Sequence, residues 1–177
     1  MLTKISIALS TLWLGAALFF SAVVAPAAFG VLRQFGVANS GEIAGAIVNR
    51  SLRVVNLSGF FLGLLVLLLI LFSKSRGLTW ILRLVSLVVM VAATAVGQWM
   101  IAARMHALRV AMVVPIDRVE PSDPQRLAFD QLHTYSVGLL STAMLAAIFA
   151  IVLMLLRRDT AASEQWQSGT GVPPVVS

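Results

Sequence analysis

Among the titratable side chains of this sequence, His133 occupies the most distinctive position. It stands where a polar, charged stretch gives way to a long apolar one. Asp130 lies three residues earlier, one turn away if the segment is helical. A carboxylate at that spacing would orient the imidazole ring and favour its protonated form. Such a ring can bind a metal or haem, relay a proton, or tie its helix to a neighbour.

Polar residues also recur at helical spacing within or beside apolar stretches, as Thr94, Gln98 and Arg109 do, with Met105 on the same stripe. Polar groups close to hydrocarbon are costly unless they face water or a bundle interior, so a cluster of them can mark a site. The same groups can instead be structural, with amides and hydroxyls bonding between helices and arginines extending to the interface. The predicted cluster, for small-ligand binding or for bundle stability, comprises Arg53, Asn56, Gln98, Arg104, Asp130, His133 and Ser136.

A metal or haem site is the alternative interpretation of the same region. His133 would be one ligand, and His106 or Met105 would be the second, since a thioether suits Cu(I). No H-x-x-x-H or M-x-x-M run is present, and methionine is also an ordinary packing residue. We therefore expect no cofactor. The sequence also lacks G-x-S-x-G and H-E-x-x-H motifs, which favours a protein that is not an enzyme.

Membrane-spanning helices are the elements that must position these residues. The chain is 59% hydrophobic and 11% charged, with a mean hydropathy of +0.95. So little charge does not cover a soluble globule, which implies that lipid covers the surface. Four charge-free stretches are long enough to cross a bilayer, namely residues 5–32, 54–73, 84–103 and 131–156. The predicted fold is an all-α integral membrane protein with four transmembrane helices in an antiparallel bundle.

The domain boundaries follow from these stretches. We predict one transmembrane domain, residues 1–158, with spans at about 8–32, 53–73, 80–103 and 134–156, and a disordered polar tail, residues 159–177. Two longer loops, residues 33–53 and 104–126, lie on the face opposite the termini. Asp123 as N-cap and Pro124 at the first helical position predict that the fourth helix starts there. Pro26 predicts a kink near the end of the first helix.

The predicted partners follow from charge and from small residues. The net charge is +6, but the basic residues flank apolar stretches, as membrane anchors do, so we expect a lipid bilayer and no nucleic acid. Gly59 and Gly63 form a G-x-x-x-G pair, which packs inside the bundle or forms a face for a homo-oligomer. The absence of cysteine excludes disulfides, thiolate metal sites and cysteine nucleophiles.

Orientation depends on where the basic residues lie. Seven arginines are on the predicted loop face, against six basic residues on the face of the termini: Lys4, Lys74, Arg76, Arg83, Arg157 and Arg158. These six sit in short segments close to the spans, where positive charge most strongly favours the cytoplasm. We therefore expect both termini in the cytoplasm and a multi-pass protein of a prokaryotic inner membrane. The first apolar run is too long for a signal peptide and is predicted to be a span.

Four segments of the chain resemble a known family: residues 12–29, 41–48, 104–109 and 129–136 look like the four-span family typified by transmembrane protein 205. Pro26 and Phe29 match its Pro–Phe segment, whereas the Met105–His106 pair is not matched to the family pattern. Its F-x-x-L-H-x-x-S element is matched by Phe129, Leu132, His133 and Ser136. The resemblance, over about residues 8–156, implies a four-helix membrane bundle of uncharacterised activity. It also implies a distant similarity to small membrane bundles that handle copper or haem.

Overall fold

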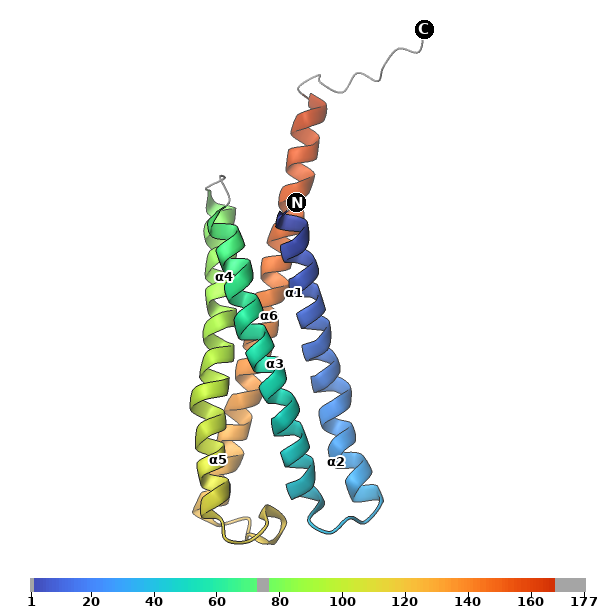
Figure 1. Cartoon of the computed structure of the whole chain (residues 1–177), viewed down its shortest axis with the longest axis vertical. Helices are drawn as coiled ribbons and strands as arrows, with labels where there is room; N and C mark the ends of the chain where they lie inside the picture. The colour runs from blue at the N-terminus through green and yellow to red at the C-terminus, as the bar shows by residue number, and fades with distance from the viewer. Residues whose placement is uncertain (1, 73–76, 168–177) are drawn as a thin grey trace.

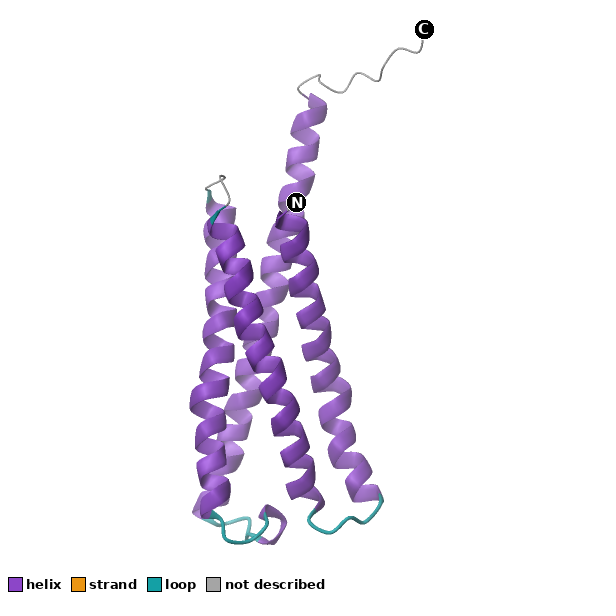
Figure 2. Cartoon of the chain, viewed as in Figure 1, coloured by secondary structure: helices purple, strands orange, loops and turns teal. Residues whose placement is uncertain are grey.

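The computed structural model of the protein describes residues 2–72 and 77–167, and within these residues it contains helices but no strands (Figure 2). The first rod of the bundle is continuous and consists of α1 (Leu2–Phe19), a π-helix η1 (Phe20–Val24) and α2 (Ala25–Gln34). The second is α3 (Ser40–Leu71). The third consists of α4 (Leu78–Ala95), a π-helix η2 (Val96–Ile101) and α5 (Ala102–Ala111). A 3₁₀ turn η3 (Ile116–Arg118) precedes the fourth rod, α6 (Pro124–Gln167).

Each rod contains a helix long and apolar enough to cross a membrane. The rods run antiparallel, and α3 and α6 each pack against both α1 and α4 (Figure 1). This arrangement confirms the predicted all-α, four-span membrane fold. The predicted start of the fourth helix is also confirmed. The Asp123 side-chain oxygen Oδ1 accepts hydrogen bonds from the backbone N–H groups of Gln125, at 2.7 Å, and Arg126, at 3.4 Å.

The helices extend beyond the spans predicted from charge-free stretches, and this corrects the predicted lengths of the loops. The connection between α2 and α3 is only residues 35–39, and that between α5 and η3–α6 starts at residue 112. Charged residues end the lipid-facing part of a rod but not its helix, because arginine and glutamate are good helix formers. With 32 residues, α3 is about 48 Å long, against a hydrocarbon core of about 30 Å, so it projects beyond the lipid.

The predicted disordered tail needs a similar correction, because α6 continues through residues 159–167. Alanine, glutamate and glutamine favour a helix in this segment, and glycine appears only after it, at residue 169. Residues 168–177 of the predicted tail, and the connection at residues 73–76, lie outside the described residues.

Two π-helices interrupt the rods. Pro26 accounts for the first, because it has no N–H to donate and its ring crowds the preceding turn, which widens at η1. This is the position at which the sequence predicted a kink. The second, η2, contains Gly97 and Gln98 and no proline. π-Helices are rare and are frequently found at functional sites, so η2 is a candidate functional position in the bundle.

The core depends on close approaches between helices. The Trp13 indole N–H on α1 donates a hydrogen bond to the Val55 carbonyl on α3, at 3.0 Å. A Cβ added to Gly59 would lie 2.7 Å from Cε2 and Nε1 of Trp13, and one added to Gly63 would lie 2.7 Å from Cγ2 of Val91. The G-x-x-x-G pair therefore packs inside the chain. A homo-oligomer stays a prediction, and it would need a surface other than this pair.

Toward the loop face the bundle divides into two helix pairs. There α2 packs against α3, and α5 packs against α6, while neither α2 nor α5 contributes a buried residue. Residues 124–135 of α6 likewise include none that is buried. Figure 1 shows the two pairs separating toward their lower ends. Contact between η3 and α3 joins the pairs again at the loop face.

Candidate functional site

The residues of the predicted polar cluster separate into a buried group and an exposed group. Asn56 and Ser136 are buried at 4% and 6% exposure, and Gln98 is partly buried. Arg53, Arg104, Asp130 and His133 are exposed. The single cluster expected from the sequence is therefore two sets of residues with different surroundings.

We call the buried set, together with Thr94, the inner polar layer. Thr94 is 1% exposed, and its hydroxyl donates to carbonyls of its own helix, those of Met90 and Val91, both at 3.0 Å. Asn56 on α3 faces η2, because its Nδ2 would lie 3.4 Å from a Cβ added to Gly97. Gln98 Oε1 is buried and has no hydrogen-bond partner among the described residues. A buried acceptor without a donor costs about 1–3 kcal/mol, so this atom requires an explanation.

The exposed set includes Arg104, which lies in a groove between α5 and α6. This α5–α6 groove has a volume of about 500 Å³, and its walls come from Ala107, Leu108, Ala128 and Leu132, with Gln131 and Tyr135 beside them. Arg104 makes no ion pair or hydrogen bond with any described residue. The groove therefore combines aliphatic walls with a cation that has no counter-charge among the described residues.

The tie between helices that Asp130 and His133 suggested from the sequence is not formed in the described part of the chain. Both residues are exposed, and neither forms an ion pair with a described residue. The buried face of α6 runs through Ser136 and Leu140, with Leu132 partly buried one turn earlier. His133 precedes Ser136 by three residues and Leu140 by seven, so it lies on the same side of the helix, but it falls within residues 124–135, none of which is buried. In that stretch Phe129 and Leu132 are partly buried, whereas His133 is exposed.

The candidate metal ligands are likewise not gathered. His106 is exposed and Met105 is partly buried on α5, while His133 is exposed on α6. In the described ranges, no three His, Cys, Asp or Glu side chains lie together as metal ligands would. Copper or haem at His133 therefore has no ligand cluster to draw on there, and the expectation of no cofactor stays a prediction.

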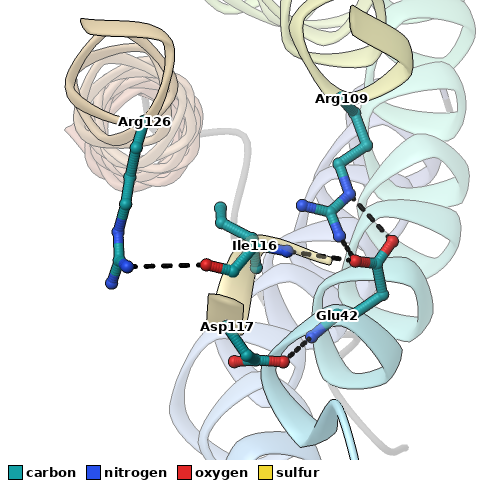
Figure 3. Close-up of polar contacts among 5 residues, drawn as sticks. All are labelled: Glu42, Arg109, Ile116, Asp117 and Arg126. Atoms are coloured by element: carbon teal, nitrogen blue, oxygen red, sulfur yellow. Dashed lines mark hydrogen bonds and ion pairs between the residues drawn. The ribbon is translucent and has the colours of Figure 1, made fainter. Parts of the chain in front are cut away.

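A polar network that the sequence did not predict closes the loop face, and we call it the loop clasp (Figure 3). Arg109 on α5 donates from Nε to Glu42 Oε1 on α3, at 2.9 Å, and its Nη2 pairs with Glu42 Oε2. The backbone N–H of Ile116 donates to Glu42 Oε2 at 3.3 Å. Glu42 thus connects α3 to both α5 and η3, which are parts of the other side of the bundle.

Asp117 completes the loop clasp by capping α3. The residue before α3, Asn39, has a left-handed backbone (φ 56°), and its side chain makes no capping hydrogen bond. Instead, Asp117 Oδ2 accepts the backbone N–H of Glu42 at 3.1 Å. A carboxylate there satisfies a free N–H group and complements the positive end of the helix dipole. Arg126 holds the same loop through the carbonyls of Ile116, at 3.5 Å, and Val119.

Comparison with known proteins gives one match. A family model described as a domain of unknown function (DUF4149) matches residues 8–113. No curated protein and no solved structure matches the chain. The matched residues extend from α1 through α5, so they include Glu42 and Arg109 of the loop clasp and leave out Asp117 and all of α6.

Proposed function

Since the family to which this chain belongs, DUF4149, is a domain of unknown function, we propose a role for the protein from the geometry of its helix bundle. The protein binds a small anionic amphiphile and catalyses no reaction. The α5–α6 groove is the observation that supports this proposal. Its volume lies within the range of small-molecule pockets, roughly 300–1,000 Å³. Aliphatic walls accept a hydrocarbon chain, and Arg104 at the same groove accepts an anionic head.

The position of the groove along the helices fits an amphiphile. Arg104 directly follows the predicted span of residues 80–103, so it lies where lipid meets water. Arginine presents a planar fork of N–H donors that matches a carboxylate or a phosphate. Tyr135 and Gln131 add hydrogen-bonding groups to the groove, and Leu132 adds apolar surface opposite Arg104. Exposure of the arginine keeps the head exchangeable with the surrounding membrane.

The test is the binding of a fluorescent long-chain fatty acid to purified protein in micelles. We expect saturable binding, and we expect Arg104→Gln to weaken it about tenfold, because a hydrogen bond to a charged group contributes about 1.5–3 kcal/mol when dry and less at an exposed site. Arg53→Gln is the matched control, since Arg53 is also exposed and flanks a predicted span on α3 outside the groove.

Two outcomes would count against the groove as the site. One is equal weakening by Arg104→Gln and Arg53→Gln, which would indicate general attraction of an anion to a basic surface. The other is equal affinity for the methyl ester of the same fatty acid, which has no charge for Arg104 to recognise.

The alternative function is that of a copper- or haem-binding protein that uses His133. An absorbance spectrum and a copper analysis of the same purified protein test this alternative. A haem absorbance band, or one copper per chain that is lost in His133→Ala, would replace the amphiphile proposal.

Membership of the four-span family typified by transmembrane protein 205 is also a proposal. The F-x-x-L-H-x-x-S element that supports it lies at residues 129–136, beyond the matched residues 8–113.

The proposed location is the inner membrane of a prokaryotic cell, with both termini in the cytoplasm and the loop clasp on the opposite side. Four apolar helices support a multi-pass membrane protein. The orientation rests on the basic residues close to the spans on the face of the termini.

A further inference from the structure

The inner polar layer lies where the two helix pairs of the bundle meet. On the loop side of this level, α2 pairs with α3 and α5 pairs with α6. The α5–α6 groove brings Arg104 and Leu108 together with Leu132 on the antiparallel α6. Farther from the loops, the same two rods carry Gln98, six residues before Arg104, and Ser136, four residues after Leu132. The polar layer is therefore the first interior level above the part of the bundle that has no buried residues on α2 or α5.

The groups in this layer leave one acceptor to be satisfied from outside the described chain. Thr94 uses its hydroxyl within its own helix, so it does not serve Gln98. Gln98 Oε1 is buried without a hydrogen-bond partner among the described residues, and Asn56, which lies against Gly97, and Ser136 on α6 are more than nine-tenths buried. Buried polar groups in native proteins are nearly always paired with protein, water or ligand. An acceptor at Gln98 requires a donor, which excludes an anion as its partner.

The backbone at this level is also built for a close approach. Gly97 belongs to η2, and a Cβ there would already touch Nδ2 of Asn56, at 3.4 Å. The π-helix therefore brings its backbone against the Asn56 amide of α3, and the next residue, Gln98, has its buried Oε1 atom without a partner among the described residues. We propose that the inner polar layer is a binding site, separate from the α5–α6 groove, for a neutral hydroxyl group that donates its hydrogen bond to Gln98 Oε1.

Two sources can supply that hydroxyl: a water molecule, or the alcohol head of a neutral amphiphile that enters between the helix pairs. They are separated by thermal unfolding of the full chain in a detergent that has no hydroxyl groups, a dodecyl amine oxide. The probes are 1-decanol and its methyl ether, which has a similar chain but no donor. The variants are Gln98→Met, Ser136→Ala and, as matched control, Gln34→Met at the exposed end of α2.

If an alcohol head binds, 1-decanol raises the unfolding temperature of the wild type by about 2–4 °C, the ether does not, and the rise is lost in Gln98→Met. If water is the donor, neither probe acts, and Gln98→Met lowers the unfolding temperature by about 2–4 °C while Gln34→Met leaves it unchanged. Ser136→Ala removes a single oxygen atom, so it tests the layer if Gln98→Met does not fold. It must reduce the response to 1-decanol or, in the water case, lower the unfolding temperature.

The proposal is overturned if neither probe acts and Gln98→Met is as stable as the wild type or more stable, because the acceptor then has no donor to lose. It is also overturned if 1-decanol stabilises Gln98→Met and the wild type equally. Arg104→Gln separates this site from the groove, since it should weaken the fatty acid and leave the response to 1-decanol unchanged.

Discussion

Gly59 shows how one absent side chain determines the distance between two helices. The Trp13 ring occupies the place where a Cβ at residue 59 would lie, and the same ring donates its N–H to Val55 on the facing helix. In a membrane, no hydrophobic force drives helices together, so association depends on such close packing and on hydrogen bonds between helices. The tryptophan contributes both at a single position.

We predict that Gly59→Ala destabilises the protein by about 1–3 kcal/mol, because the indole ring must shift and its hydrogen bond to Val55 must lengthen. Thermal unfolding in micelles measures the change. Gly15→Ala is the control, since a Cβ on Gly15 meets nothing within 4 Å. That variant should be neutral or gain about 0.5–1 kcal/mol from the better helix former. Similar losses in both variants would contradict the assigned contact.

His133 illustrates the opposite case, in which a suggestive residue lies on the expected side of its helix but outside the packed part of the bundle. Ser136 and Leu140, three and seven residues later, are buried on the same side of α6, whereas His133 is exposed. The difference comes from depth along the helix, because residues 124–135 of α6 include none that is buried. Spacing along a sequence defines the side of a helix but not the level at which neighbouring helices pack against it.

At the scale of elements, α3 has its N-terminus capped by a residue far away in the chain. Asn39 does not cap the helix, and Asp117, which precedes α6 in the loop, takes that role. The capping bond therefore reports whether the loop is docked. The same loop also joins the two helix pairs through Glu42 and Arg109.

We predict that Asp117→Ala costs about 0.5–2 kcal/mol of stability, the usual effect of losing a helix cap. Hydrogen exchange at the amide of Glu42 should become faster, because that N–H loses its acceptor. Glu120→Ala in the same loop is the control, since Glu120 is exposed and does not cap α3. Unchanged exchange at Glu42 in Asp117→Ala would show that the cap does not form in solution.

For the whole molecule, the number of spans determines where the ends of the chain lie. Four crossings return the chain to its starting side, and the two described connections at residues 35–39 and 112–123 lie together on the other face (Figure 1). The extra length of the rods projects past the lipid on that face, where the loop clasp holds the two helix pairs together.

We predict that reporter fusions at Leu2 and after Ser177 agree with each other and both report the cytoplasm. The first expectation follows from the even number of spans, and the second follows from the short basic segments on that face. Opposite signals from the two fusions would be incompatible with four crossings. Matching signals from outside the cell would leave the fold intact and reverse the orientation.

The sequence by itself determined the features that depend on local composition. Charge-free stretches predicted four membrane helices, and Asp123 followed by Pro124 predicted the start of α6, because a cap satisfies N–H groups within three residues. Only the tertiary structure decided which side chains meet. Glu42 and Arg109, or Gly59 and Trp13, are brought together by the rotation and depth of whole helices. These are determined by packing summed along each rod, and no short segment of the sequence carries that information.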